Sequence, residues 1–556
     1  MTDPDRTERE PGRPAEPPPG RAGGRLASRL FLAVLLVAAL VRLGHLQRGL
    51  PYLHYWDEPH TAAPSIRMMK TGDLNPGRFR YGSLPSYLFL ASDVAHWVWA
   101  NRRPDPITGE RPQLEDIQTQ YETGWLWSIS HPGYYAWNRA VVALAGCGTI
   151  ALLWLLAGWR ARRAALLGAV LLAGLRSHVH YSVMIAPDMI AACLCVSVVA
   201  LVLRFHDTQR FGFLLAAFVA WGAATATKYN AAIVGIVPVV AFAIARRRGL
   251  QRTPGWYALG PLIAVLTFCA CMPYAILDLP TFLKDVGIEV YHYSHAGHFD
   301  KSAEPGLSHV LLQLDGFAQR LTLFVFPLCV LGLLSLVRTT RGRLLLLFPV
   351  VAFVLQAQTT VRFHRNLMPV YPFLALGFGL VIERLLVEAR ARGLGRLAAG
   401  LVVSGALAFL AVVGVDAWRT GTVVETRTRA AELVARLARE HGWRKIGFDE
   451  NLHMHPQDLA RIGAVVVEDD LRRLVARGTE FDALVAGAEF AARESEEEFA
   501  NLEIEARTAS ELNAARAGRE VVAEIPGGPT YLQKPSRDPG LVVLGPAPAA
   551  AAPGGD

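Results

Sequence analysis

The sequence predicts an all-α polytopic membrane domain followed by a small α/β domain. Only 19% of the 556 residues are charged and 52% are hydrophobic, whereas an ordinary soluble domain has about 25% charged residues. Apolar runs of roughly 20 residues recur between residues 30 and 415, and such a run is long enough to cross a hydrocarbon core. After residue 415 amphipathic and β-like segments replace these runs. Disordered, collagen-like and disulfide-scaffold proteins are therefore excluded.

The positions of the arginines predict the topology. Short arginine clusters fall on alternate connections between the apolar runs, and positive charge favours the cytoplasmic side. The N-terminus is then cytoplasmic, and an odd number of crossings places the C-terminal region outside. We expect about eleven spanning helices, at residues 30–46, 135–157, 164–180, 187–204, 211–227, 229–245, 256–274, 320–337, 343–359, 366–386 and 396–415.

The net charge of +8 is unevenly distributed. Of the 56 basic and 48 acidic residues, 17 and 24 respectively lie from Asp416 onward, so the basic excess belongs to the preceding part. That excess indicates contact with membrane lipids and not nucleic-acid binding, because it lies between apolar runs. The six cysteines lie inside apolar segments without metal-ligand spacing, so we expect small core residues and no disulfides.

The chain divides into four parts by composition. The first apolar run follows Arg25 and Arg29 without a small-residue cleavage site, which predicts an uncleaved signal anchor. Pro-rich, polar ends without periodicity predict disorder. The expected parts are a disordered cytoplasmic tail (1–28), the membrane domain (29–415) with outer loops 47–134 and 276–319, an extracytoplasmic α/β domain (416–534) and a disordered tail (535–556).

Helical and β-like patterns predict the elements outside the membrane spans. In the first outer loop, apolar and charged residues of segment 59–74 alternate at helical spacing, which predicts an amphipathic helix along the membrane surface. Segment 101–113, with three prolines, is expected to be an exposed loop. The α/β domain is expected to contain a helix at 426–441 and strands at 445–448, 464–467 and 483–486.

Carboxylates on the outer side are the first candidates for chemistry. Asp57 and Glu58 follow the first apolar run within the segment HYWDEPH, and carboxylates beside a bilayer are costly unless used or solvated. They fit a general base or an acceptor-orienting group, although a solvated loop pair remains an alternative. Asp188, after Pro187, opens a later helix on the same side. It is either a helix cap or a second cavity carboxylate suited to proton abstraction and acceptor orientation.

Basic and aromatic residues on the same side form a second set. Basic residues on the outer side run against the positive-inside trend, so each requires an explanation such as a bound anion or an ion pair. A phosphate provides one, because arginine offers a bidentate fork and lysine a point charge. Snorkelling or pairing with the carboxylates is the alternative. The candidates for substrate or phosphate binding are Arg80, Tyr81, Arg139, Lys228, Tyr229, Arg362 and Arg365.

Three histidines in the second outer loop are also candidates. His292, His295 and His298 are spaced three apart, so two of them would share a helix face. They can bind sugar hydroxyls or phosphate, or form a plain polar loop. A zinc or other divalent metal site with the carboxylates is possible, but the pattern commits to no cofactor.

Together these motifs resemble the type C superfamily of membrane glycosyltransferases, in particular the group of protein O-mannosyltransferases and lipid A aminoarabinose transferases (ArnT-like). The resemblance covers roughly residues 30–415. It rests on the Asp-Glu pair after the first helix, the Pro-Asp pair that opens a later helix, the Lys-Tyr-Asn helix entry at residue 228 and the segment RFHRNLMPVYPF from residue 362.

This resemblance implies an inverting transfer of a sugar from a polyprenyl-phosphate donor at the outer face of the cell (inner or plasma) membrane. The acceptor would be a lipid, glycan or protein of the cell envelope. Such a donor is already activated, and the sequence shows no Gly-rich nucleotide-binding loop. By the same resemblance, Asp57 would be the base with Glu58 as its neighbour and Asp188 the second carboxylate. Arg80, Lys228, Arg362 and Arg365 would contact the donor phosphate.

Two other functions compete with this one. A transporter or flippase of a lipid-linked sugar would also need apolar walls and cations, but such proteins often have repeated halves around a midplane site. The sequence shows no repeat, and its ionisable residues gather at one face. A non-catalytic assembly protein with a sensory outer domain would explain the α/β domain but not the carboxylates.

Overall fold

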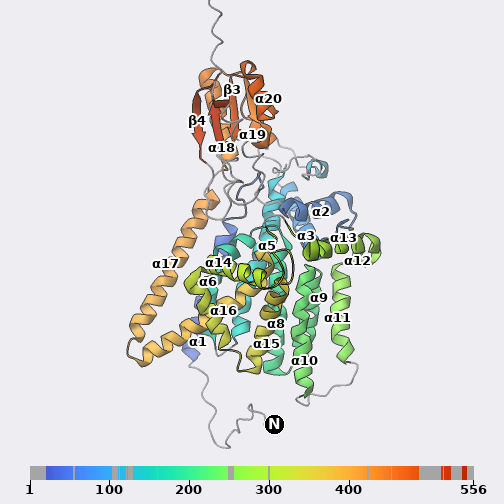
Figure 1. Ribbon diagram of the computed structural model, residues 1–556, viewed down its shortest axis with the longest axis vertical. Coiled ribbons are helices and arrows are strands. Elements are labelled where there is room, and N and C mark those ends of the chain that lie inside the picture. Colours follow the sequence, from blue (N-terminus) through green and yellow to red (C-terminus); the bar gives the residue numbers. More distant parts are fainter. Residues whose placement is uncertain are drawn as a thin grey trace, which may run out of the picture.

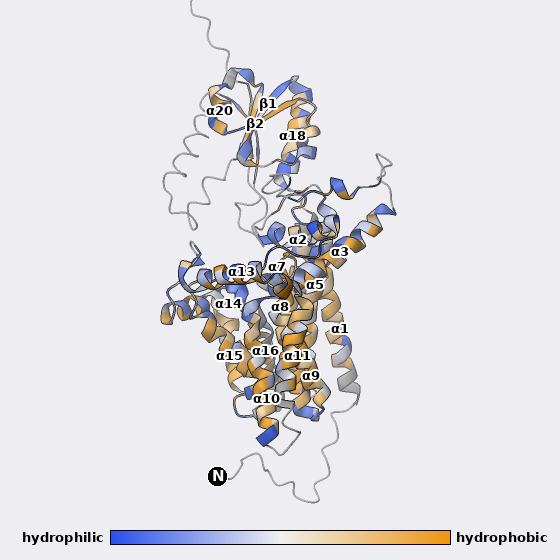
Figure 2. Cartoon of the chain, turned by 90° about the vertical axis from the view of Figure 1, so that its right-hand side faces the viewer, coloured by the Kyte–Doolittle hydropathy of each residue, from blue (hydrophilic) through white to orange (hydrophobic). Residues whose placement is uncertain are grey.

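The computed structural model has a helical membrane domain with a small α/β domain beyond one end of it (Figure 1). Hydrophobic residues dominate the bundle, while blue, hydrophilic segments lie at its ends and in the α/β domain (Figure 2). The structure describes residues 21–53, 57–102, 111, 113–119, 122, 129, 131–158, 161–247, 256–298, 301–422, 425–452, 454–487, 515–516, 519–526 and 541–546.

Every apolar run predicted to span the membrane coincides with one helix or with two helices in succession. In the described chain, seven helices are long and apolar enough to cross a membrane, and two shorter apolar helices accompany them. The chain is therefore a multi-pass membrane protein. The helices are α1 (Arg21–Leu43), α5 (Pro132–Ala157), α6 (Arg162–Gly174), α7 (Arg176–Tyr181), α8 (Pro187–Thr208), α9 (Phe211–Thr225), η2 (Tyr229–Gly235), α10 (Ile236–Arg247), α11 (Trp256–Cys271), α14 (Leu307–Leu334), α15 (Thr340–Gln356), η5 (His364–Val370), α16 (Tyr371–Ala391) and α17 (Gly395–Thr422).

Burial differs strongly among these helices. In α8, 67% of the apolar window is buried, whereas in α17 the share is 6%. Small residues allow close helix packing, as is common in membranes. A side chain at Gly332 of α14 would collide with the Gly377 carbonyl of α16. The bundle is thus built around α8, and α17 lies at its edge (Figure 1).

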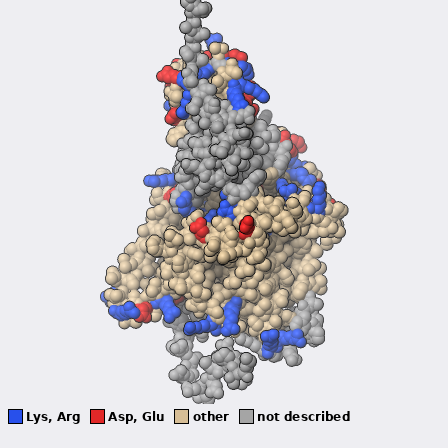
Figure 3. Space-filling view, in the orientation of Figure 1, with Lys and Arg blue, Asp and Glu red and all other residues tan. Residues whose placement is uncertain are grey.

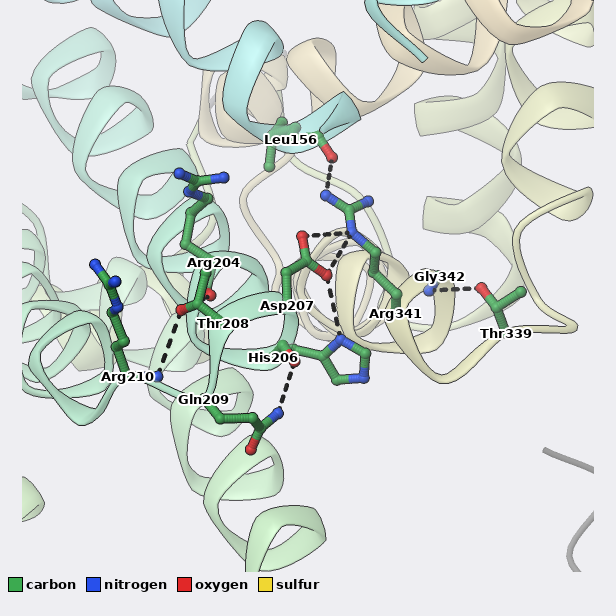
Figure 4. A network of polar contacts seen from close by, with 10 residues as sticks. All are labelled: Leu156, Arg204, His206, Asp207, Thr208, Gln209, Arg210, Thr339, Arg341 and Gly342. Carbon is green, nitrogen blue, oxygen red and sulfur yellow. Dashed lines mark hydrogen bonds and ion pairs between the residues drawn. The ribbon is translucent and has the colours of Figure 1, made fainter. Parts of the chain in front are cut away.

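Lys and Arg side chains gather at the lower rim of the membrane domain, and a broad uncharged band separates them from the charges nearer the α/β domain (Figure 3). At this rim, Arg341 Nε lies 3.2 and 3.3 Å from the two carboxylate oxygens of Asp207. Arg341 Nη2 donates to the Leu156 carbonyl at 2.9 Å (Figure 4). These contacts join the ends of α5, α8 and α15. The arginine-rich connections at residues 204–210 and 338–343 therefore lie together.

Several shorter elements cover the opposite end of the bundle (Figures 1 and 2). Helix α2 (Asp57–Thr71) occupies most of the segment predicted to be an amphipathic helix. The sequence pattern did not predict α3 (Leu84–Asn101), because Ser92, Asp93 and His96 interrupt its apolar periodicity. The remaining elements are η1 (Leu114–Asp116), α12 (Tyr274–Leu277), α13 (Leu279–Tyr291) and the π-helix η3 (His292–Ala296).

The α/β domain is a three-layer sandwich. The sheet has the order β2-β1-β3-β5-β4, in which β1 pairs in parallel with β2 and β3, and β5 pairs antiparallel with β3 and β4. Helix α18 packs on one face with Ile446 and Val543, and α20 packs on the other with Leu484 and Val542. The elements are α18 (Thr426–His441), β1 (Lys445–Asp449), η6 (Glu450–Leu452), α19 (Pro456–Ala460), β2 (Val465–Asp469), α20 (Leu471–Ala476), η7 (Gly478–Glu480), β3 (Ala483–Gly487), β4 (Val521–Ile525) and β5 (Leu541–Leu544).

Two predicted tail boundaries need correction. Residues 21–28 belong to α1, because the helix begins before its apolar run. Residues 541–544 form β5, whose four apolar residues are buried between β3 and β4 although Pro, Ala and Gly dominate the surrounding composition. Residues 1–20, 535–540 and 547–556 of the predicted tails, and most of the loop 101–113, lie outside the described residues.

Candidate functional site

Two carboxylates and two cations meet at the end of the bundle nearest the α/β domain. They come from four separate segments: the first turns of α2 and α8, the residue before η2, and η5. Arg365 Nη1 donates to Asp57 Oδ2, and Lys228 Nζ donates to Asp188 Oδ1 at 2.7 Å. Arg365 also interacts electrostatically with Asp188. The fold therefore brings these four predicted site residues into one cluster.

The Asp188–Lys228 pair is buried and extended by two polar side chains. The side chains of Lys228 and Asp188 are 8% and 4% exposed. Lys228 Nζ also donates to Asn366 Oδ1 at 2.7 Å, and Asn366 Nδ2 donates to Tyr293 OH at 3.2 Å. Buried ions need such compensation because desolvation is expensive. The N-cap of α8 is Ala186, so Asp188 does not occupy the cap position.

The Asp57–Arg365 pair is more open. The Asp57 side chain is 28% exposed and that of Arg365 is 14% exposed. The guanidinium lies 4.4 Å from the centroid of the Phe363 ring, which adds a cation–π contact. Arg365 Nε is buried and has no hydrogen-bond partner among the described residues. Since buried donors are nearly always satisfied, this N–H is available to a ligand acceptor.

Glu58 lies in a different environment from its neighbour Asp57. Its side chain is 0% exposed and binds Arg139 in a bidentate ion pair, with distances of 2.7 and 2.8 Å. Glu58 Oε1 also accepts the Ile185 N–H at 3.1 Å. Arg139 Nη1 donates to the carbonyls of Leu46 and Arg48. Glu58 and Arg139 therefore tie the first turn of α2 to α5 and to two loops.

Tyr81 lies beside the cluster, and Tyr229 fixes the segment that carries Tyr81. Lys228 Nζ lies 5.9 Å from the centroid of the Tyr81 ring. Tyr229 OH donates to the carbonyl of Phe79 at 2.7 Å, which fixes the segment that carries Tyr81. Burial raises the pKa of Tyr81 well above its ordinary value, so its hydroxyl stays protonated and can donate a hydrogen bond.

The other two predicted cations are not partners in these ion pairs, although Arg80 interacts electrostatically with Glu289 of α13. Arg80 is exposed. Arg362 Nε donates to the Ser302 carbonyl at 3.1 Å, and its backbone N–H donates to the Lys301 carbonyl at 2.8 Å. Arg362 therefore joins its segment to the loop before α14, whereas Arg365 faces Asp57.

The three histidines do not share one face. The rings of His292 and His298 contact each other with centroids 5.4 Å apart. His295 instead stacks on Tyr291 and contacts the Ser294 hydroxyl at 2.6 Å. The π-helix changes the residue spacing that the sequence suggested. Among the described residues, no group of three or more His, Cys, Asp or Glu side chains could hold a metal ion.

Three further residues belong to the cluster and were not predicted. Asn366 and Tyr293 extend the buried pair, and each is adjacent to a residue that the motifs do single out. Glu289 on α13 interacts electrostatically with Lys228, and burial raises its pKa. Sequence position gives no signal for Glu289, because it is one of several polar residues on an amphipathic helix.

Comparison with known proteins agrees with the resemblance drawn from the motifs. Residues 137–274 match the family model described as Dolichyl-phosphate-mannose-protein mannosyltransferase. This segment contains Asp188 and Lys228, and the match indicates a glycosyltransferase. No curated protein gives a significant sequence match.

One solved structure supports the fold, and two others are similar to a lesser degree. ArnT from Cupriavidus metallidurans bound to undecaprenyl phosphate is 18% identical, with a TM-score of 0.50 over 93% of this chain and 97% of that chain. Its apo state is 16% identical, with a TM-score of 0.49 over 94% and 98%. The archaeal oligosaccharyltransferase AglB from Archaeoglobus fulgidus, in complex with an inhibitory peptide and a dolichol-phosphate, is 12% identical, with a TM-score of 0.43 over 88% and 72%. The chain therefore has an ArnT-like fold.

The Glu58–Arg139 pair generates a stability prediction. Glu58→Gln leaves the Arg139 guanidinium buried without its counter-charge, which typically costs about 3–5 kcal/mol. We expect a marked fall in the thermal unfolding temperature of the purified protein. Glu388→Gln is the matched control, because the exposed Glu388–Arg392 pair on α16 contributes only about 0.3–0.5 kcal/mol. Equal unfolding temperatures for both variants would contradict a structural role for Glu58.

Proposed function

We propose that this protein is an integral membrane glycosyltransferase that moves a sugar from a polyprenyl-phosphate donor to a lipid, glycan or protein acceptor, with inversion. The observation that carries the proposal is the cluster of Asp57, Asp188, Lys228 and Arg365 at the end of an apolar bundle. The family match supports the reaction class. Undecaprenyl phosphate in the ArnT structure supports a lipid phosphate as the carrier.

Arg365 is the proposed principal contact for the donor phosphate. Its buried Nε lacks a partner among the described residues, and its Nη1 contacts Asp57. The leaving phosphate gains negative charge as the bond to the anomeric carbon breaks. A preorganised cation in a partly dehydrated site stabilises that charge most in the transition state. Lys228 contributes a second, already paired positive charge nearby.

Asp57 is the proposed base because it is the more accessible of the two carboxylates. Its side chain is 28% exposed, against 4% for Asp188. The acceptor hydroxyl attacks the anomeric carbon from the face opposite the phosphate and gives its proton to Asp57. The bond to the phosphate oxygen breaks as the new bond to the acceptor oxygen forms. Asp188 then serves to hold Lys228, and Glu58 to hold the first turn of α2.

The proposed topology has eleven crossings of the inner or plasma membrane, a cytoplasmic N-terminus and an extracytoplasmic site. The basic clusters of the lower rim support it, because they lie at the C-terminal end of α8 while Asp188 lies at its N-terminal end (Figure 4). A helix of 22 residues is about 33 Å long, roughly the thickness of a hydrocarbon core. The site and the α/β domain then share the outer side.

The most informative test of the function measures sugar transfer directly. The purified protein is incubated with a panel of polyprenyl-phosphate sugars and membrane extract, and the glycans are analysed by mass spectrometry. The proposal requires that one donor is consumed and that its sugar reappears on an acceptor. Movement of an intact donor between leaflets without transfer would instead favour a flippase.

The topology predicts a labelling pattern. A cysteine introduced at position 57 or at Arg429 on α18 should react with an impermeant maleimide added from outside the cell. A cysteine at Arg247, at the end of α10, should react only after permeabilisation. Protection of position 429 in intact cells would overturn the proposed orientation.

The assignment of Asp57 predicts the effect of Asp57→Asn. This change keeps the size of the side chain and removes the base, so we expect the turnover rate to fall by about 10²–10⁴. Donor binding and folding should persist, because Asp57 is partly exposed. Asp315→Asn, an exposed position on α14, is the matched control. Near-normal turnover in Asp57→Asn would remove the base assignment.

The assignment of Arg365 predicts a graded loss of phosphate affinity. Arg365→Gln should weaken binding of both a polyprenyl-phosphate sugar and the bare polyprenyl phosphate. Arg365→Lys should restore only part of the affinity, because an ammonium cannot replace a bidentate fork. Arg343→Gln, at the exposed lower rim, should change neither. If Arg365→Gln lowers only thermal stability, Arg365 balances Asp57 and the phosphate assignment is wrong.

A further inference from the structure

Tyr52 joins the membrane domain to the α/β domain. Its side chain is 0% exposed. The hydroxyl donates to Asp458 Oδ2 at 2.7 Å and accepts the backbone N–H of His455 at 2.9 Å. Tyr52 and Asp458 are 406 residues apart in the sequence. Burial raises the pKa of Tyr52, so the hydroxyl remains a neutral donor to the carboxylate.

The ring of Tyr52 is held as firmly as its hydroxyl. The guanidinium of Arg427, at the start of α18, lies 4.0 Å from the ring centroid. A buried ion pair with Glu425 at 2.7 Å holds that guanidinium in place. Cation–π contacts strengthen when both partners are desolvated. The α/β domain therefore contacts both the hydroxyl and the ring of Tyr52.

A second contact lies beside the first. His455 Nδ1 accepts the Gln457 N–H at 3.2 Å, so its proton resides on Nε2. That Nε2–H donates to the Ile129 carbonyl at 3.1 Å. The Ile129 N–H in turn donates to the Pro51 carbonyl, directly before Tyr52. The two contacts thus converge on the same short segment of the first loop.

The covalent connection between the domains is helix α17. This helix leads into the α/β domain, and only 6% of its apolar window is buried (Figure 1). Near its C-terminal end, Val413 and Ala417 form one buried cluster with Val41 of α1 and Val179 of α7, so α17 itself is anchored to the bundle. Among the described residues, the buried contacts between the domains centre on Tyr52 and on Ile129.

We propose that the α/β domain positions the catalytic segment through Tyr52. Tyr52 lies five residues before Asp57, and Glu58, directly after Asp57, is fixed by Arg139. In the sequence, Asp57 therefore lies between Tyr52, which contacts the α/β domain, and Glu58, which Arg139 holds. Tyr52 and Asp458 are positioning residues, and this role rests on the proposed function of Asp57.

The first test measures docking without any reference to catalysis. A protease site is inserted between Thr422 and Glu425 of the full-length protein, and the chain is cleaved after purification. We expect the α/β fragment to stay bound. Tyr52→Phe removes the buried hydrogen bond to a charged group, so it should weaken retention about tenfold. Asp458→Asn keeps an oxygen acceptor but removes its charge, so it should weaken retention less. The double variant should lose less than the sum of the two single losses, because both changes disturb the Tyr52–Asp458 hydrogen bond.

Tyr87→Phe is the matched control, because its hydroxyl donates to the Leu74 carbonyl at an exposed position. It should leave retention unchanged. Full retention of the α/β fragment in the Tyr52→Phe protein would overturn the proposal at its first step.

The second test asks whether docking controls the position of Asp57. In an Asp57→Cys background, Tyr52→Phe should change the rate of thiol labelling at position 57. In the otherwise unchanged enzyme, Tyr52→Phe should lower kcat about tenfold, while the KM for the donor stays the same because Arg365 and Lys228 are intact. Weaker docking with an unchanged labelling rate and kcat would make Tyr52 merely structural. If no transfer occurs in any protein while docking and labelling change, the proposed function fails and the junction stands.

Discussion

The buried ion pair between Glu58 and Arg139 is the interaction on which the arrangement of the site depends. A carboxylate and a guanidinium at 0% and 3% exposure persist among apolar helices only if their hydrogen-bonding groups are satisfied. Arg139 reaches both carboxylate oxygens and two backbone carbonyls, and Glu58 also accepts a backbone N–H. These contacts fix the first turn of α2 relative to α5 and α8, and they hold Asp57 from its C-terminal side.

This constraint gives the two adjacent carboxylates, Asp57 and Glu58, different roles. Glu58 is fully used inside the protein, which leaves Asp57 at the edge of the cluster with a partly exposed side chain. A similar division separates the two cations. Lys228 is enclosed by Asp188 and Asn366, whereas Arg365 keeps one buried N–H without a described partner. One pair thus holds the framework in place, and the other retains capacity for a ligand.

Much of the fold and part of the site could be predicted from the sequence. The apolar runs identify the membrane helices because hydrophobic length is a local property. Asp57, Asp188, Lys228 and Arg365 stand out because charge beside a bilayer is costly. The separate roles of Asp57 and Glu58 could not be predicted, since the partner of Glu58 is 81 residues away. The strand β5 could not be predicted either. Its residues lie in a Pro- and Ala-rich stretch, so the composition gives no sign that they pair with β3 and β4.

The position of β5 in the sheet has a consequence for biogenesis. The strand lies between β3 and β4, yet it comes from residues 541–544, after every membrane helix in the chain. The ribosome must therefore translate the whole bundle before the sheet can close, and domains generally fold as units. In the nascent chain, the bundle residues are therefore complete before the last strand of this sheet exists. The order of translation therefore makes this sheet one of the last parts of the protein that can form.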